Sequence, residues 1–177
     1  MAAQDIAVAL QRVESVLLRR PEAGLHEDAP ATARWDGGTR IVASHANGRQ
    51  VLTDMPTEMG GGGDQVTPGW LFRAALASCA ATRIAMSAAS EGIELGTLDV
   101  LASSRSDARG LLGMADADGT AVRAAPCDVQ LLVRISAHGV PAERLRALVE
   151  DSHRQSPVSC AAQEALPVAL RIEVDGH

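Results

Sequence analysis

Hydrophobic positions recur along this chain with two periods, one typical of helices and one typical of strands. Residues 5–19 carry an apolar stripe at helical spacing, which predicts an amphipathic helix that ends near Pro21. The residues of that stripe are Ile6, Leu10, Val13 and Leu17. Residues 167–174 instead alternate between apolar and polar positions, which predicts a final strand.

A long apolar segment in the middle of the chain predicts the central helix. Thr67 and Pro68 form a favourable N-cap and first helical residue, and the helix is expected to run to about Ser90. Gly92 then supplies a C-terminal stop. Its apolar residues point in nearly all directions, as expected for a helix at the centre of a fold. Many of them are alanine, which would let another element approach closely.

Turn signals divide the rest of the chain into shorter elements. Residues 33–43 are expected to form a strand, a turn at Asp36-Gly37-Gly38 and a second strand, and Asn47-Gly48 predicts a hairpin before the strand at 49–53. Further strands are expected over 97–106 and 128–137, a helix over 141–154, and a short helical turn from Ser156-Pro157. The four consecutive glycines in 55–68 fit no phosphate-binding motif and predict a flexible loop. The order of elements predicts an α+β domain over 33–177, preceded by an N-terminal helix and linker over 1–32.

Composition and charge exclude several classes of function. All 16 basic residues are arginine, and neither Lys nor Tyr occurs, so mechanisms that need a catalytic lysine or a tyrosine hydroxyl are excluded. The net charge is −6 and no basic run occurs, which argues against nucleic acid and anionic membranes as partners. No segment reads as a signal peptide or a membrane span, and we expect a cytoplasmic protein. The five histidines lack metal-binding spacing, so neither a metal nor a cofactor is expected.

The remaining candidates for catalytic residues are three widely spaced cysteines, which do not form a disulfide framework. Cys79 lies midway along the central helix, where Arg83, one turn later, could stabilise a thiolate; a buried apolar role is the simpler alternative. Cys160 follows the predicted helix start at Ser156, where a first-turn thiol would be activated by unpaired N–H groups, unless it only packs. Cys127 at a strand entrance is interpreted as structural.

Two stretches of this chain carry a more specific pattern. One runs from Pro68-Gly69-Trp70-Leu71-Phe72 to Ala77-Ser78-Cys79, after the glycine-rich loop, and the other is Ser156-Pro157-Val158-Ser159. Together they resemble the OsmC / organic hydroperoxide resistance (Ohr) family. The resemblance covers about residues 33–175. It implies an OsmC-like fold, with antiparallel sheets around a long central helix in an intertwined homodimer. It also implies a thiol-dependent peroxidase whose partners are a small organic hydroperoxide and a dithiol reductant.

By that resemblance, Cys79 is the cysteine that attacks the peroxide. A second family cysteine, which closes a disulfide, would stand where this chain has Ser156. We therefore predict that Cys160, one helical turn later, acts in its place, provided that the two Cα atoms come within roughly 7 Å. The family's helix-opening glutamate is replaced by Gly69. Its thiolate-holding arginine is assigned to Arg40, with two alternatives, namely Arg34 and Arg49.

The sequence leaves two hypotheses about function. In the first, the chain reduces organic hydroperoxides through Cys79, with Cys160 as the second thiol and Arg40 or Arg83 stabilising the thiolate. In the second, it is a catalytically impaired OsmC-fold dimer that binds an apolar small molecule at the dimer interface. Ser156 and Gly69 favour the second hypothesis, whereas Cys79 and Cys160 favour the first.

Overall fold

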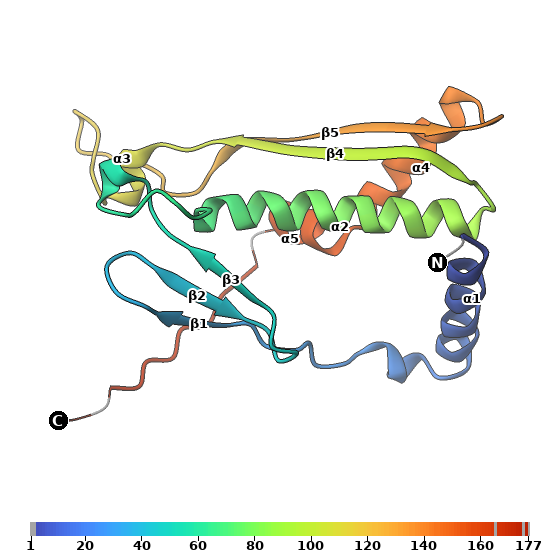
Figure 1. Ribbon diagram of the computed structural model, residues 1–177, viewed down its shortest axis with the longest axis horizontal. Coiled ribbons are helices and arrows are strands. Elements are labelled where there is room, and N and C mark those ends of the chain that lie inside the picture. Colours follow the sequence, from blue (N-terminus) through green and yellow to red (C-terminus); the bar gives the residue numbers. More distant parts are fainter. Residues whose placement is uncertain (1–2, 165, 175, 177) are drawn as a thin grey trace.

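The computed structural model describes residues 3–164, 166–174 and 176. Helix α2 (Pro68–Ser90) runs through the middle, covered along its length by a sheet of two long strands (Figure 1). A second sheet of three short strands lies near the N-terminal end of α2, and α1 (Ala3–Arg19) packs near its other end. This arrangement confirms the predicted α+β fold and the central position of the long helix.

Helix α2 begins and ends where the sequence predicts. The side-chain oxygen of Thr67 accepts a hydrogen bond of 3.2 Å from the backbone N–H of Trp70, which satisfies one free donor of the first turn. Pro68 opens the helix with its φ already fixed near the helical value. At the far end Gly92 takes a φ of 67°, a left-handed conformation that glycine adopts without strain.

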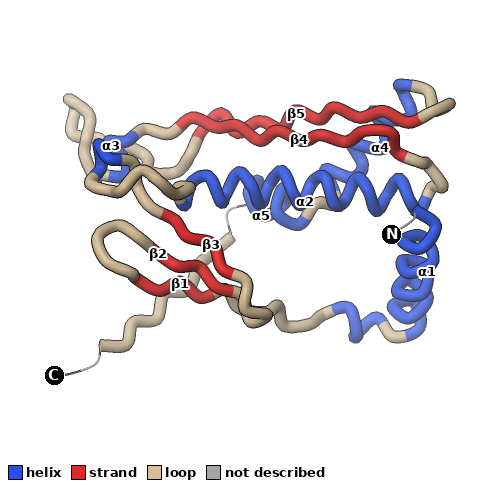
Figure 2. Tube along the Cα trace, viewed as in Figure 1, coloured by secondary structure: helices blue, strands red, loops and turns tan. Residues whose placement is uncertain are grey.

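The core lies between α2, the long sheet and α4 (Ala142–Arg154). Strands β4 (Leu95–Arg105) and β5 (Cys127–Ala137) pair antiparallel and run alongside α2 (Figure 2). Alternate apolar side chains of the two strands pack against the core, as the two-residue period of a strand requires. The buried core residues are Ile84, Ala88, Ile93, Leu145 and Leu148. The opposite face of the sheet carries cross-strand pairs such as Asp99 opposite Arg134 and is exposed to solvent.

The second sheet is an antiparallel meander of three four-residue strands, β1 (Thr32–Trp35), β2 (Ile41–Ser44) and β3 (Gln50–Thr53). Both predicted turns are present, because Gly37, Gly38 and Gly48 all have a positive φ. Three short helices were not predicted. They are η1 (Pro21–Gly24) in the linker, η2 (Thr57–Met59) before the glycines, and α3 (Ala108–Leu111) between β4 and β5.

The predicted final strand is wrong for the chain taken alone. Residues 166–174 form no strand, and residue 175 lies outside the described residues. The four alternating apolar side chains are 73–91% exposed: Val168, Leu170, Ile172 and Val174. Alternation predicts a strand correctly only where a neighbouring strand supplies hydrogen-bond partners, and this segment has none within the described chain.

Two further expectations need adjustment. Helix α4 begins at Ala142, so Pro141 is its N-cap rather than its first helical residue. Helix α2 is not buried on all sides, because Trp70 and Phe72 in its first turns are exposed. Its buried residues lie from Leu76 onward, where the sheet, α4 and α5 (Pro157–Gln163) contact it.

Candidate functional site

The sulfur of Cys79 lies where α2 meets the start of α5. Cys79 is half-buried, and its Sγ accepts a hydrogen bond of 3.3 Å from the hydroxyl of Ser156. The Ser159 hydroxyl in turn donates to the Ser156 hydroxyl over 3.2 Å. Both serines are buried, with exposed fractions of 0% and 2%. Two hydroxyl donors in series therefore end on one cysteine sulfur.

The local structure of α5 explains how Ser156 reaches that sulfur. Ser156 occupies the N-cap position, as predicted, and Pro157 is the first helical residue. A serine at this position usually accepts a hydrogen bond from the first turn, but the Ser156 side chain makes no such bond. Its hydroxyl points across to Cys79 instead. From the sequence this side chain is expected only to cap α5, and its contact with a residue 77 positions away is not predicted.

Cys160 lies half-buried in the same short helix, and its thiol donates to the backbone carbonyl of Arg154 over 3.3 Å. Cys79, Cys160 and the exposed Cys127 are all free thiols. The hydrogen bond to Cys79 thus comes from Ser156, not from Cys160. The role of Cys160 as the resolving cysteine stays a prediction.

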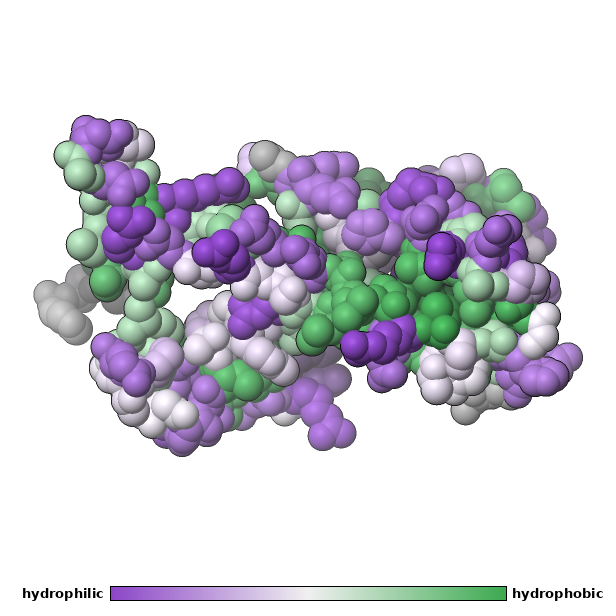
Figure 3. All heavy atoms as spheres, turned by 90° about the horizontal axis from the view of Figure 1, so that it is seen from above, coloured by the Kyte–Doolittle hydropathy of each residue, from purple (hydrophilic) through white to green (hydrophobic). Residues whose placement is uncertain are grey.

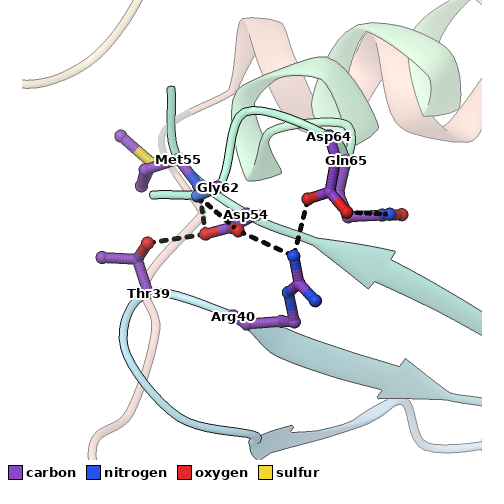
Figure 4. Close-up of polar contacts among 7 residues, drawn as sticks. All are labelled: Thr39, Arg40, Asp54, Met55, Gly62, Asp64 and Gln65. Carbon is purple, nitrogen blue, oxygen red and sulfur yellow. Dashed lines mark hydrogen bonds and ion pairs between the residues drawn. The ribbon is translucent and has the colours of Figure 1, made fainter. Parts of the chain in front are cut away.

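The predicted arginines lie in two different places. Arg83, one turn after Cys79 on α2, donates to the side-chain oxygen of Gln155, the residue directly before Ser156. Its positive charge is thereby held at the junction of α2 and α5. Arg40 instead forms ion pairs with Asp64 at 2.6 Å and Asp54 at 3.4 Å (Figure 4). Of the two alternatives for Arg40, Arg34 forms an exposed ion pair with Asp36 at 3.7 Å.

Asp54 organises a polar cluster that the sequence did not reveal. Its carboxylate accepts hydrogen bonds from the Thr39 hydroxyl at 2.6 Å and from the backbone N–H groups of Met55 at 2.8 Å and Gly62 at 2.9 Å (Figure 4). These donors, the Thr39 hydroxyl first, lower the pKa of Asp54 from 3.8 to about 2. The side chain is only 4% exposed.

The glycine-rich segment is therefore a loop, as predicted, but a tightly held one. A Cβ at Gly61 would lie 1.8 Å from the backbone oxygen of Met55, so only glycine fits there. Gly63 donates from its backbone N–H to the same oxygen at 3.3 Å. In the sequence, the one indication of this cluster is that Asp54 directly precedes the glycine-rich segment. Which backbone N–H groups surround its carboxylate is determined only when the loop folds.

Acid is expected to weaken this cluster in a narrow range of pH. Because the pKa of Asp54 falls on folding, its carboxylate stabilises the fold above about pH 4, and that contribution is lost as pH falls toward 2. D54N should lower the unfolding midpoint at pH 7 and reduce its further loss between pH 4 and 2, as measured by thermal unfolding. D36N, at an exposed position, is the control. Equal acid sensitivity of D54N and the unaltered protein would contradict this role.

A cavity of about 1010 Å³ lies beside α2, the helix that carries Cys79. Its walls come from α2, β5, α4, α5 and the loops near α3, and they are mostly apolar: Phe72, Leu76, Ala80, Leu131 and Val133 are examples. Ser159 also lines it, so the hydroxyl pair connects the cavity wall with Cys79. Seen from above, the molecule is hollowed at the end opposite α1 (Figure 3).

The family model for the OsmC-like proteins matches residues 61–171, which include α2, Cys79 and the Ser156 segment. The chain belongs to this family, as its resemblance predicted. None of the curated proteins matches the chain. No helix in the described part of the chain is long and apolar enough to cross a membrane, and no group of metal-ligating side chains gathers there.

Solved structures of OsmC-like proteins share this fold. An OsmC-like protein from Mycoplasma pneumoniae aligns with a TM-score of 0.65 and 13% identity, covering 80% of this chain and 91% of that one. An organic hydroperoxide resistance protein from Legionella pneumophila gives 0.57 and 21%, with coverages of 78% and 91%. The organic hydroperoxide resistance protein OhrB of Bacillus subtilis gives 0.52 and 21%, with coverages of 78% and 93%.

Proposed function

We propose that this chain is a thiol-dependent peroxidase that reduces organic hydroperoxides through Cys79. The observation that carries the proposal is the half-buried Cys79 sulfur, which Ser156 hydrogen-bonds, together with a large apolar cavity. The cavity wall includes Ser159 and the α2 residues Leu76 and Ala80, which precede and follow Cys79. A hydroxyl donor favours the thiolate, which is the nucleophilic form of cysteine. An apolar wall favours an alkyl or aryl hydroperoxide over hydrogen peroxide. The structures named above for hydroperoxide resistance support the same class of reaction.

The reaction begins with attack of the Cys79 thiolate on the peroxide. A sulfur–oxygen bond forms as the oxygen–oxygen bond breaks, and the departing alkoxide takes a proton to become an alcohol. Cys79 is then a sulfenic acid. A second thiol attacks that sulfur, water leaves, and a disulfide forms. A dithiol reductant reduces the disulfide and restores Cys79, so that each peroxide consumes two electrons.

A second thiol and an arginine of the chain are proposed to assist. Cys160 is the proposed second thiol, and it must turn away from the Arg154 carbonyl and shift with the first turn of α5 to reach Cys79. Arg40 is the proposed arginine for the thiolate, and it must leave its two carboxylate partners to act so. Arg83, already held beside Ser156 by Gln155, needs no such release.

One equivalent of cumene hydroperoxide added to the reduced protein tests the proposal. We expect Cys79 to be oxidised, as mapped by intact mass and peptide analysis. Loss of two hydrogens, mapped to Cys79 and Cys160, supports resolution within the chain. A gain of one oxygen on Cys79 alone supports resolution by an external thiol. If Cys79 stays reduced, the peroxidase proposal is refuted.

A second candidate function is a catalytically impaired dimer that binds an apolar small molecule. The cavity of about 1010 Å³ favours it, as do the replacement of the second cysteine by Ser156 and of the family's glutamate by Gly69. The oxidation experiment distinguishes the two, because a binding protein of this kind leaves Cys79 reduced.

We further propose that the working unit is an intertwined homodimer in the cytoplasm. Ala75, Ser78 and Thr82 form an exposed strip of small residues along α2, where a second copy of this helix can approach closely. The exposed C-terminal segment supplies a strand that the chain cannot pair by itself. Three free thiols suit a reducing compartment, such as the cytoplasm.

A further inference from the structure

The buried hydroxyls of Ser156 and Ser159 form a hydrogen-bonded pair that ends on the Cys79 sulfur. The Ser156 side chain makes no capping hydrogen bond, although it occupies the N-cap position of α5, and its hydroxyl donates to the Cys79 sulfur at 3.3 Å. Ser159 donates to it over 3.2 Å, although this serine lines an apolar cavity. Buried hydroxyls are retained where they have partners, and here each partner leads toward Cys79.

We propose that Ser156 and Ser159 are positioning residues for Cys79, which hold its sulfur in place and stabilise it in the thiolate form. A thiolate sulfur only accepts hydrogen bonds, so it fits the end of a series of donors. The bond from Ser159 polarises the Ser156 hydroxyl and strengthens its donation to the sulfur. Ser156 thus stands where the family's second cysteine would be, and in place of forming a disulfide it stabilises the Cys79 sulfur.

The same donor suits the oxidised cysteine, and this part of the inference rests on the proposed peroxidase function. Once Cys79 carries a sulfenic oxygen, the Ser156 hydroxyl can donate to that oxygen as it did to the sulfur. Since serine cannot form a disulfide, the sulfenic acid persists until a thiol reaches it. Its lifetime is therefore expected to depend on Ser156.

Alkylation by iodoacetamide tests the first part without any peroxide. In this reaction the thiolate sulfur attacks the reagent's CH₂ carbon and iodide leaves. Loss of a hydrogen bond to a charged group lowers the thiolate fraction about tenfold, but the remaining thiolate is more nucleophilic. S156A is therefore expected to alkylate at Cys79 about threefold more slowly at pH 7. At high pH, where both thiols are fully ionised, the order is expected to reverse, because the thiolate without its hydrogen bond is the more nucleophilic.

Two further variants keep the test decisive. S159A leaves Ser156 in place and should slow alkylation in the same direction by a smaller factor. S152A removes another fully buried hydroxyl, which donates to Ser87 at 2.8 Å and not to Cys79, so its alkylation rate should equal that of the unaltered protein. Rates for S156A and S159A that equal or exceed the unaltered rate at pH 7, in folded protein, would overturn the inference.

The oxidised state is tested by trapping the sulfenic acid with dimedone after two equivalents of cumene hydroperoxide, since each further step of oxidation consumes one equivalent. We expect S156A to yield several-fold less trapped sulfenic acid than S152A, and more sulfinic acid. Equal yields would overturn the second part of the inference. If neither protein is oxidised, the proposed function fails, while the alkylation result still stands or falls by itself.

Discussion

Replacing Cys79 by serine is expected to lower the rate of organic hydroperoxide reduction by about a thousandfold or more, because a hydroxyl is a poor nucleophile at neutral pH. The substitution changes one atom and keeps a hydrogen-bond partner for Ser156, so the fold should be retained. The measurement is consumption of cumene hydroperoxide with dithiothreitol as reductant. The thermal midpoint of C79S, measured in parallel, should lie close to that of the unaltered protein.

C127S is the matched control for this loss. Cys127 is exposed at the first residue of β5, and its sulfur makes no hydrogen bond within the described residues, so its removal should leave the rate unchanged. A C79S protein that still reduces the peroxide, or a C127S protein that no longer does, would show that the reactive thiol has been misassigned.

Removal of the C-terminal segment is expected to convert a dimer into a monomer. In residues 166–174 the four alternating apolar side chains are 73–91% exposed, and burial of each would contribute about 1.5–3 kcal/mol. A second copy of the chain can supply both a strand edge and an apolar surface for them. A chain that ends at residue 164 should therefore sediment as a monomer at concentrations where the full chain sediments as a dimer.

A control within this segment separates strand pairing from charge. Arg171 lies between apolar positions and forms an exposed ion pair with Glu173 at 2.6 Å. R171Q should keep the dimer, whereas I172D, on the apolar side, should weaken it. A full-length chain that sediments as a monomer, or a shortened chain that remains dimeric, would rule out this segment as the pairing element.

Local signals in the sequence predicted the elements that local interactions determine. Thr67-Pro68 and Gly92 marked both ends of α2, because capping and left-handed backbone depend on neighbouring residues. The last strand was wrong for the opposite reason. The alternation is present, but a strand needs a partner, and no pattern within residues 167–174 can reveal whether the same chain supplies one.

The candidate site likewise has one part that local sequence predicts and one part that it does not. Cys79 could be singled out from its helix and from the family resemblance, whereas its hydrogen bond to Ser156 joins residues 77 positions apart. The Asp54 cluster was missed because its donors come from a turn, a strand end and a glycine loop, and their convergence exists only after folding. Long-range convergence leaves no mark in local periodicity.

The missing cap of α5 has a consequence for how often this site opens. Without a side-chain acceptor from Ser156, the first backbone N–H groups of a seven-residue helix lose the partner that usually holds them. Short helices with open ends unfold locally at low free-energy cost. Amide hydrogen exchange should therefore be faster at Val158 and Ser159 than in the middle of α2. Each such opening carries the hydroxyl pair away from Cys79, so the exposure of this sulfur to large reagents follows the fraying of one helical turn.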